Sequence, residues 1–195
     1  MSKRWADHFT ERAKLEGYKA RSVYKLREIH ERFRVFKLGD KVLDLGCYPG
    51  SWSQFALEQV GERGRVFGID ILEVRDLSDH RFSFHRADVL RLSPGELLDL
   101  VGPVDVVLSD LAPSTTGIRV VDSAKFMELV LKALEVAKTV LKPNGIFVFK
   151  AFESKELGIL RHEIRSLFRN LKAFRPKATR ARSKEVFTIC LGLKT

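Results

Sequence analysis

The sequence predicts an α/β protein with a parallel β-sheet, because short apolar runs of strand length alternate along the chain with longer segments of helical periodicity. The apolar runs are nearly continuous, as in residues 146–149, which is typical of strands covered by helices on both faces. Several of these runs also end in an aspartate that is followed by a turn. Since ligands of open α/β sheets bind at the carboxyl ends of the strands, we expect a ligand site at that edge.

Six segments have the length and composition of strands. They are residues 41–46, 64–70, 82–88, 104–110, 145–152 and 185–194.

Two long segments between these strands, residues 123–141 and 154–168, place their apolar side chains on one stripe and are predicted to be helices. Pro143, Asn144 and Gly145 follow the first segment and are expected to end that helix. The second helix covers either the same face of the sheet as the first or the opposite face, and the pattern does not decide between them.

The N-terminal part of the chain is basic and also has helical spacing, with Val23, Leu26, Ile29 and Phe33 on one stripe. We therefore expect the segment of about residues 1–38 to dock on the body of the protein rather than to form a separate module. The length of 195 residues, 45% of them hydrophobic, suits a single domain over residues 1–195.

The composition indicates a cytoplasmic protein without a membrane span. The longest apolar runs are strand-sized, and the first residues are charged rather than signal-like. Cys47 and Cys190 form no CxxC pair, and the five histidines show no metal-ligand spacing with them. We expect neither a disulfide framework nor a metal site.

The net charge of +10 is concentrated at the two ends of the chain. Residues 1–41 contain twelve Lys and Arg against six Asp and Glu, and residues 172–195 contain seven against one. Residues 42–171 are nearly balanced, with sixteen basic and eighteen acidic residues. Basic ends on a nearly neutral body suit binding to a phosphate backbone, and a merely solubilising surface is the alternative.

Acidic residues occur at the carboxyl ends of the first four predicted strands, and a glycine-containing turn follows the first. The candidate cofactor-binding residues in this region are Asp44, Gly46, Pro49, Gly50, Trp52, Asp70, Asp88 and Asp110. The alternative is that these carboxylates only cap helices.

The glycine turn does not match a dinucleotide-binding fold, which needs GxGxxG, because three residues separate Gly46 from Gly50. S-adenosyl-L-methionine fits this edge better, since it has no phosphate and carries a positive sulfonium. Its ribose hydroxyls suit Asp70, its adenine amino group suits Asp88, and Trp52 is placed to line the pocket. We therefore predict S-adenosyl-L-methionine as the cofactor.

The segment after the fourth predicted strand favours a hydroxyl group as the methyl acceptor. Residues 109–113 lack the aromatic side chain that stacks on a flipped base in enzymes that methylate exocyclic amines. Methylation of a pyrimidine carbon needs a cysteine nucleophile, but Cys190 lies in the last strand and Cys47 in the glycine turn.

The chain resembles the FtsJ/RrmJ family of ribose 2′-O-methyltransferases over essentially its whole length. The shared stretches are KRW…HF, RSVYKLREI, DLGCYPGSWSQ, SDLAPSTTG, VFKAF, IRSLF and RARSKEVF. The resemblance implies a Rossmann-like class I S-adenosylmethionine-dependent methyltransferase fold, with a mostly parallel seven-stranded sheet, an antiparallel last strand and helices on both faces. Where bacterial members usually have Ala-Ala-Pro-Gly-Gly, this chain has Cys47-Tyr48-Pro49-Gly50-Ser51.

The family's active site is a Lys-Asp-Lys-Glu tetrad, which the resemblance places at Lys25, Asp110, Lys150 and Glu185. Lys150 is unusual in its own right, because it ends an apolar strand where an unpaired ammonium is disfavoured unless it reaches solvent. We predict that Lys150 accepts the ribose proton, that Asp110 orients it, and that Lys25 and Glu185 position the ribose. The sequence leaves open whether Lys150 acts as a neutral base or as a cation.

We assign the basic ends to the RNA backbone as a group. The candidate RNA-binding residues are Lys3, Arg4, Arg12, Lys14, Lys19, Arg21, Arg180 and Arg182. The resemblance implies 23S rRNA or the large ribosomal subunit as the partner, with a uridine of the A-loop as the acceptor, and we expect a monomer. The alternatives are a tRNA ribose 2′-O-methyltransferase and a non-catalytic RNA-binding ribosome-assembly factor.

Overall fold

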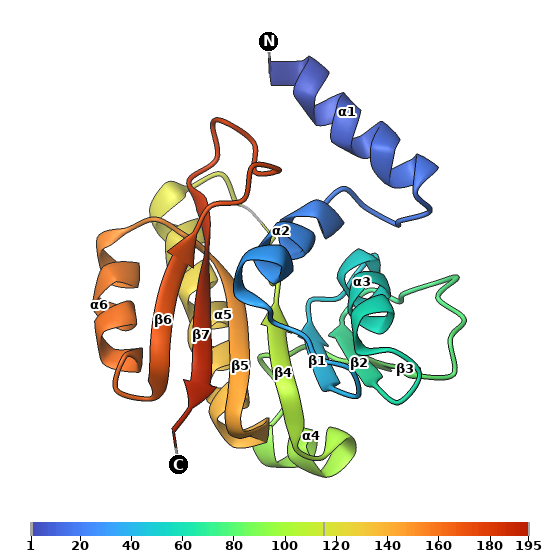
Figure 1. Cartoon of the computed structure of the whole chain (residues 1–195). Helices are drawn as coiled ribbons and strands as arrows, with labels where there is room; N and C mark the ends of the chain where they lie inside the picture. Colours follow the sequence, from blue (N-terminus) through green and yellow to red (C-terminus); the bar gives the residue numbers. More distant parts are fainter. Residues whose placement is uncertain (1, 115, 195) are drawn as a thin grey trace.

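The structure is a computed structural model that describes residues 2–114 and 116–194, with the backbone alone for residues 2–7 and 119. The described residues form a seven-stranded sheet in the order β3-β2-β1-β4-β5-β7-β6 (Figure 1). Its strands are β1 (Lys41–Leu45), β2 (Arg65–Asp70), β3 (Phe82–Arg86), β4 (Val104–Ser109), β5 (Leu141–Phe152), β6 (Phe168–Phe174) and β7 (Glu185–Leu193). The helices are α1 (Ser2–Leu15), α2 (Val23–Phe33), α3 (Ser51–Val60), α4 (Pro94–Val101), α5 (Arg119–Val140) and α6 (Lys155–Ile164).

The sheet is mostly parallel, and its last strand runs against both neighbours. β3, β2, β1, β4 and β5 pair in parallel, whereas β7 pairs antiparallel with β5 and with β6. Strand order reverses between β1 and β4, so the loops that follow these two strands diverge and leave room for a ligand. This topology confirms the predicted Rossmann-like fold with an antiparallel last strand.

The six predicted strands are all present, but the end of the second predicted helix was wrong. The pattern extended this helix to residue 168, whereas α6 ends at Ile164. The segment that follows forms β6 and pairs with β7, from Phe168 opposite Leu193 to Phe174 opposite Phe187. This segment therefore forms a strand that hydrogen-bonds to the free edge of β7, although the spacing of its apolar residues also suits a helix. The first long helix, α5, ends at Val140, close to the predicted stop.

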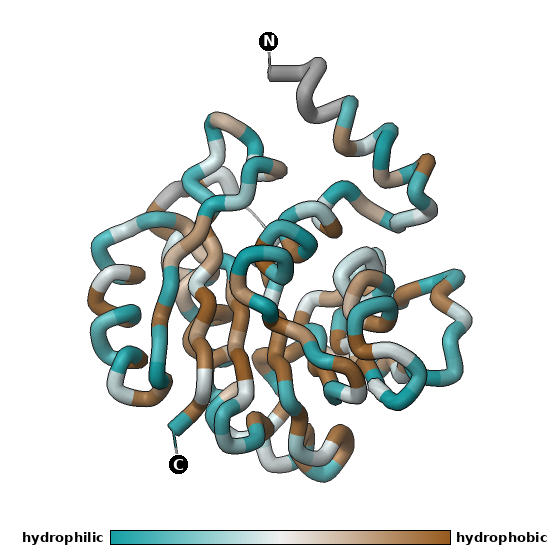
Figure 2. The backbone as a smooth tube through the Cα atoms, in the orientation of Figure 1, coloured by the Kyte–Doolittle hydropathy of each residue, from teal (hydrophilic) through white to brown (hydrophobic). Residues whose placement is uncertain are grey.

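Helices cover both faces of the sheet. One buried cluster joins Leu97 of α4, Ala133 of α5 and Leu160 of α6 to the strands, and the other joins Ile29 of α2 and Phe55 of α3 to the opposite face. The second predicted helix therefore lies on the same face as the first, which decides between the two arrangements. Figure 2 shows the hydrophobic residues concentrated in the strands, between helices and loops that are largely hydrophilic.

Helix α1 extends beyond the end of the sheet at which β7 begins, above α2 (Figure 1). Its residue Ala13 is buried in the cluster that contains α2 and α3. Within residues 2–114 and 116–194, no helix has the length and apolar character needed to cross a membrane. The described side chains also contain no group of three or more His, Cys, Asp or Glu arranged to hold a metal ion.

Candidate active site

Two lysine–carboxylate pairs lie at the edge of the sheet where β4 and β5 end and β7 begins. Lys150 Nζ lies 2.8 Å from Asp110 Oδ1 and donates a hydrogen bond of 2.8 Å to the backbone oxygen of Asp110. Lys25 Nζ lies 2.6 Å from Glu185 Oε1. The four side chains are between 9% and 20% exposed, so both pairs are largely shielded from water. The residues of the predicted tetrad thus form two close ion pairs.

The strand register explains how these residues reach one edge. β4 pairs in parallel with β5 in a register that makes Asp110 and Lys150 the next neighbours beyond the ladder. β7 runs antiparallel to β5 and places Phe187 opposite Lys150, so Glu185 is a diagonal neighbour of Lys150. Such diagonal positions are roughly 7–8 Å apart, which is within reach of one sugar unit.

Lys25 comes from α2, which is bound to the loop that precedes β7. Glu28, one turn further along α2, accepts hydrogen bonds of 2.8 and 3.0 Å from the backbone N–H groups of Lys177 and Ala178. Lys25 Nζ also lies 5.9 Å from the centre of the Phe187 ring, at cation–π distance. The helix, the loop and the strand together hold Lys25 against β7.

Three carboxylate oxygens in this region are shielded from solvent and accept no hydrogen bond. They are Asp44 Oδ1, Asp110 Oδ1 and Glu185 Oε1. The described part of the chain has six shielded side-chain nitrogen or oxygen atoms without a hydrogen-bond partner, and these are three of them. The ammonium groups of Lys150 and Lys25 lie at ion-pair distance from the last two of the three, but not in hydrogen-bond geometry. The charge of these two oxygens is therefore compensated by an ammonium group within the protein.

A cavity of about 260 Å³, which we call the cofactor cavity, adjoins Asp110. It is lined by Gly46, Tyr48, Asp70, Ile71, Leu72, Ala87, Asp88, Val89, Asp110, Leu111, Ala112 and Leu129. Gly46 has φ 77°, and a Cβ at this position would lie 3.0–3.1 Å from Leu111 atoms. A side chain here would therefore be strained and would crowd the wall of the cavity.

Asp44 and Asp70 support the turn between β1 and α3. Asp44 is fully buried and accepts a hydrogen bond of 2.7 Å from Ser53 Oγ. Burial, reinforced by the nearby carboxylates of Asp110 and Asp70, raises the pKa of Asp44 to about 7. Asp70 accepts a hydrogen bond of 2.9 Å from the backbone N–H of Tyr48 and also lines the cofactor cavity. Asp44 is not among the residues that line the cavity.

The remaining predicted cofactor residues lie around the start of α3. Gly50 has φ 109° and occupies the position before the first residue of this helix, and Pro49 lines an adjacent cavity of about 370 Å³. The Trp52 side chain is 2% exposed, donates from Nε1 to the Ser22 backbone oxygen at 2.9 Å, and packs 5.7 Å from the Phe187 ring. Its indole connects α3 with α2 and β7 instead of lining the cofactor cavity, and its contact with a ligand stays a prediction.

Comparison with known protein families shows to which family the chain belongs. The model of the FtsJ-like methyltransferase family matches residues 18–193. The chain belongs to this family.

The similarity to individual FtsJ-like proteins covers nearly the whole chain. A protein of Nitratidesulfovibrio vulgaris strain DP4 named ribosomal RNA large subunit methyltransferase E is 46% identical over 98% of this chain and 95% of its own length. The protein of the same name from Bdellovibrio bacteriovorus is 45% identical over 96% of this chain and 97% of its own length.

Solved structures support the fold of this FtsJ-like chain. A crystal structure described as a ribosomal RNA methyltransferase of Plasmodium falciparum matches with a TM-score of 0.79 and 22% identity, over 90% of this chain and 98% of that one. A second, described as an rRNA methylase of Clostridium thermocellum, matches with a TM-score of 0.60 and 21% identity, over 86% of this chain and 97% of that one. At these identities, the likeness concerns the fold.

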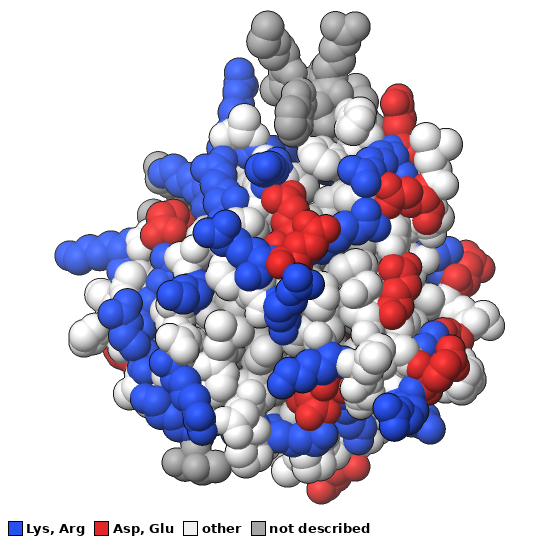
Figure 3. Space-filling view, viewed as in Figure 1, with Lys and Arg blue, Asp and Glu red and all other residues white. Residues whose placement is uncertain are grey.

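The predicted RNA-binding residues of this FtsJ-like protein lie on several elements of its outer surface. Arg12 lies 2.6 Å from Glu16, Lys19 lies 3.7 Å from Asp76, and Lys14, Arg180 and Arg182 are exposed. Arg21 donates a hydrogen bond of 2.8 Å to the Ala178 backbone oxygen. The side chains of Lys3 and Arg4 lie outside the described residues. Figure 3 shows Lys and Arg gathered over the 175–184 loop and beside α2.

The sequence reasoning missed the apolar walls of the cofactor cavity. Tyr48, Ile71 and Leu72 line it, although their side chains are 51%, 58% and 50% exposed. Ile71 and Leu72 directly follow Asp70, the end of β2. Two large apolar residues just after a strand-terminal carboxylate, where solvent exposure is expected, are the signal that could have identified them.

Proposed function

We propose that this protein transfers a methyl group from S-adenosyl-L-methionine to a ribose 2′-hydroxyl of RNA. The observation that carries the proposal is the arrangement of the Lys150–Asp110 and Lys25–Glu185 pairs beside a cavity with acidic walls. Such a site offers a proton acceptor and polar groups that can fix a sugar, which is what activation of a hydroxyl requires.

The two cysteines support a hydroxyl acceptor over a covalent mechanism. Cys47 and Cys190 are both buried, and burial raises the pKa of each thiol well above its ordinary value. A thiol that is kept protonated is a poor nucleophile. Methylation of a pyrimidine carbon through a cysteine adduct is therefore disfavoured.

The residues of the cofactor cavity fit S-adenosylmethionine. Asp70 and Asp88 suit the ribose hydroxyls and the adenine amino group, and apolar walls such as Ile71 suit the flat ring. The Asp110 carboxylate, which also lines the cavity, suits a positive group nearby. When bound there, S-adenosylmethionine would supply a methyl group on a positively charged sulfur.

In this proposal Lys150 first releases its ammonium proton to solvent and then, as a neutral amine, takes up the proton of the attacking hydroxyl. Its Nζ contacts two oxygens of Asp110, each at 2.8 Å, and the side chain is 9% exposed. The amine is therefore held in one place at the boundary of the cofactor cavity, and Asp110 stabilises the ammonium that forms on proton transfer. The Glu185 carboxylate accepts a hydrogen bond from the ribose, and Lys25, whose Nζ lies 2.6 Å from Glu185 Oε1, holds this carboxylate in position.

The RNA backbone binds along the basic ends of the chain. We include the segment of about residues 1–38 in the single methyltransferase domain, because α2 contributes Lys25 to the tetrad. The 175–184 loop, which is bound to α2 through Glu28, carries Arg180 and Arg182 to the same edge of the sheet. Basic groups flanking the tetrad suit phosphates on either side of an acceptor nucleotide.

We place the acceptor in 23S rRNA of the large ribosomal subunit, as a uridine of the A-loop. Support comes from relatives named ribosomal RNA large subunit methyltransferase E, which match the chain over nearly its full length. Neither the tRNA alternative nor the non-catalytic assembly factor has a comparable observation in its favour, and the complete tetrad argues against the latter.

The test is to incubate large ribosomal subunits, purified from cells that lack the gene, with the protein and tritiated S-adenosylmethionine. Alkaline hydrolysis of the labelled RNA then distinguishes the acceptor atom, because a 2′-O-methyl group blocks cleavage at its own nucleotide. We expect tritium in one alkali-resistant dinucleotide from the A-loop of 23S rRNA. Label in alkali-sensitive mononucleotides would place the methyl group on a base and would refute ribose methylation.

A further inference from the structure

A second cavity lies beside the tetrad and has no role in the mechanism above. Its volume is about 470 Å³, and we call it the Phe152 cavity. It meets the cofactor cavity at Ala112, two residues after Asp110, and its lining also includes Pro113 and Phe152. The two cavities therefore open on either side of the loop that carries Asp110.

Phe152 forms a half-open aromatic wall in this cavity. It is the last residue of β5, two positions after Lys150 and directly opposite Glu185 in the strand register. Its ring packs against Phe126 of α5, with 4.6 Å between the ring centres, but the side chain remains 42% exposed. An aromatic ring supported on one side and open on the other is a platform for a flat ligand.

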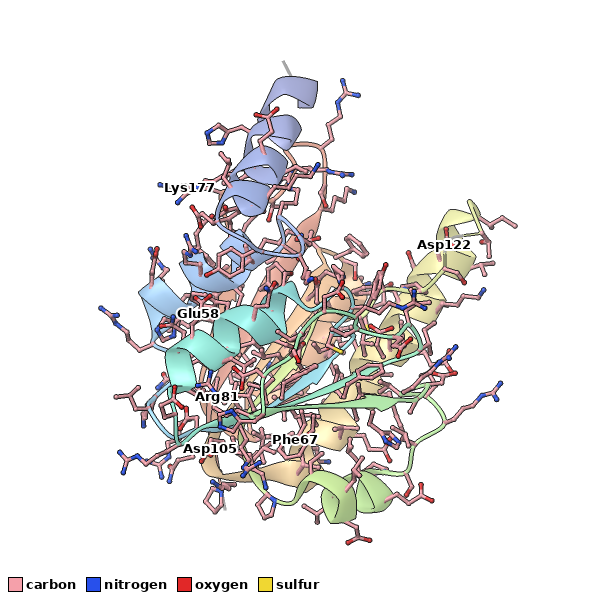
Figure 4. All side chains as sticks on the ribbon, turned by 90° about the vertical axis from the view of Figure 1, so that its right-hand side faces the viewer. Glu58, Phe67, Arg81, Asp105, Asp122 and Lys177 are labelled. Carbon is pink, nitrogen blue, oxygen red and sulfur yellow. The ribbon has the colours of Figure 1, made fainter. Side chains whose placement is uncertain are left out.

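Polar groups lie around this platform. Ser123, at the start of α5, and Lys184, directly before Glu185, line the same cavity. Asp122 also lines the cavity and lies at the outer end of α5 in Figure 4, while Asp105 lies toward the opposite end of the sheet. Asp122 fixes the loop before α5 by accepting hydrogen bonds of 2.7 and 3.2 Å from the backbone N–H groups of Thr116 and Gly117.

We infer that the Phe152 cavity binds the base of the acceptor nucleotide, which stacks on the Phe152 ring. The inference rests on the proposed function. A base is attached to the sugar carbon next to the one that bears the 2′-hydroxyl, so a ribose held at Lys150 and Glu185 places its base within a few ångströms. The cofactor cavity is filled by the methyl donor on one side, and the Phe152 cavity is the apolar space that adjoins the other.

The lining favours a base over a phosphate or an amphipathic helix as the occupant. A phosphate is disfavoured in the Phe152 cavity because its lining includes the carboxylates of Asp122 and Glu153. The smaller adjoining cavity of about 370 Å³ balances Arg175 and Lys184 against Glu153 and Glu185.

The Phe152 cavity combines the rings of Phe126, Phe152 and Pro113 with several polar side chains, and that combination matches the flat face and polar edge of a base. The polar side chains are those of Asp122, Ser123, Glu153, Ser154 and Lys184. Two of the cavity's lining residues adjoin Glu185, Phe152 across the strand pair and Lys184 along the chain, and this proximity to the tetrad assigns the cavity to the acceptor nucleotide rather than to a distant part of the RNA.

The experiment compares Phe152→Leu with Phe152→Tyr in steady-state methylation of the large subunits described above. Base stacking on an aromatic side chain predicts that F152L lowers kcat/KM on the order of 10-fold, whereas F152Y keeps it within about twofold of the wild-type value. The dissociation constant of S-adenosylmethionine, measured by calorimetry, should be unchanged in both variants because Phe152 does not line the cofactor cavity. Ile159→Ala, which removes an apolar side chain that is 54% exposed on α6, is the matched control and should leave kcat/KM unchanged.

The experiment distinguishes failure of the base subsite from failure of the proposed function. Wild-type kcat/KM in F152L, or an equal loss in F152L and F152Y, would overturn the base subsite while leaving ribose methylation intact. If the wild-type protein methylates no ribose, the proposed function fails and this inference fails with it. Should F152L unfold at a lower temperature than the wild type, Phe152→Met, which retains more of the side-chain volume, replaces it in the comparison with F152Y.

Discussion

Removing one charge of the Lys25–Glu185 pair should destabilise the protein, whereas removing both should not. Glu185→Gln leaves the Lys25 ammonium without its counter-charge, and Lys25→Met leaves the Glu185 carboxylate in the same situation. The two side chains are 15% and 12% exposed, and the paired atoms are 2.6 Å apart, so water compensates poorly for the loss of either partner.

The structure sets the size of these effects. Breaking a buried ion pair costs about 3–5 kcal/mol, and the residual exposure of 12–15% places this pair near the lower end, at about 3 kcal/mol. For a chain of 195 residues, this corresponds to a melting temperature about 6–12 °C lower. In the double variant, neutral side chains of similar volume replace both ions, so the free energy of unfolding should return to within about 1 kcal/mol of the wild-type value.

Thermal unfolding followed by circular dichroism measures the stability of the four proteins, and tritium transfer to large subunits measures their activity. We expect methyl transfer to be lost in all three variants, including the double variant with restored stability. The coupling argument is wrong if the double variant melts as low as the less stable single variant. Wild-type turnover in Glu185→Gln would remove Glu185 from the proposed site.

Three further predictions concern the proton acceptor, the buried carboxyl group and the basic loop. Lys150→Ala should abolish methyl transfer while the calorimetric affinity for S-adenosylmethionine is retained, and appreciable residual turnover would refute its role. Because burial raises the pKa of Asp44 from 3.8 to about 7, the folded protein retains a proton that the unfolded chain has lost, and stability falls as the pH rises between these values. Urea unfolding at pH 4 and pH 8 should show Asp44→Asn gaining up to about 4 kcal/mol relative to wild type over this interval, and a constant difference would contradict the shift. The double substitution of Arg180 and Arg182 by Ala should weaken RNA binding and reduce its salt dependence, whereas Lys138→Ala, in the last turn of α5, should change neither.

The sequence predicted most of the fold because its strands are buried on both faces and therefore read as continuous apolar runs. β6 escaped detection because it is an edge strand. Only Phe168 among its residues is fully buried, so it lacks such a run, and pairing with a strand distant in sequence decides its conformation. The sequence also did not decide that α5 and α6 pack on the same face of the sheet. Helical periodicity shows that a stripe of side chains is buried, but not which part of the protein covers it.

Some features of the candidate site also follow from the sequence pattern, and others do not. Carboxylates that end strands, such as Asp70 and Asp110, were found from the sequence because their chain position also fixes their place at the sheet edge. The pairing of Lys25 with Glu185 joins residues 160 positions apart, and local pattern contains no trace of it. Trp52 was predicted to line the pocket; its indole is buried between α3, α2 and β7, and its contact with a ligand stays a prediction.

The two reactants carry opposite charges, and the charge distribution of the chain separates them. The wall of the cofactor cavity contributes Asp70, Asp88 and Asp110, which attract a cationic sulfonium ligand and repel a polyanion. Basic groups lie instead over the 175–184 loop and beside α2 (Figure 3). Lys150 lies between the acidic cavity wall and the basic surface and is paired with Asp110, just as Lys25 is paired with Glu185. The tetrad therefore has no formal net charge, and it attracts neither the cationic cofactor nor the anionic RNA. A charge reversal within the cavity should therefore weaken cofactor binding, while one on the loop should weaken RNA binding.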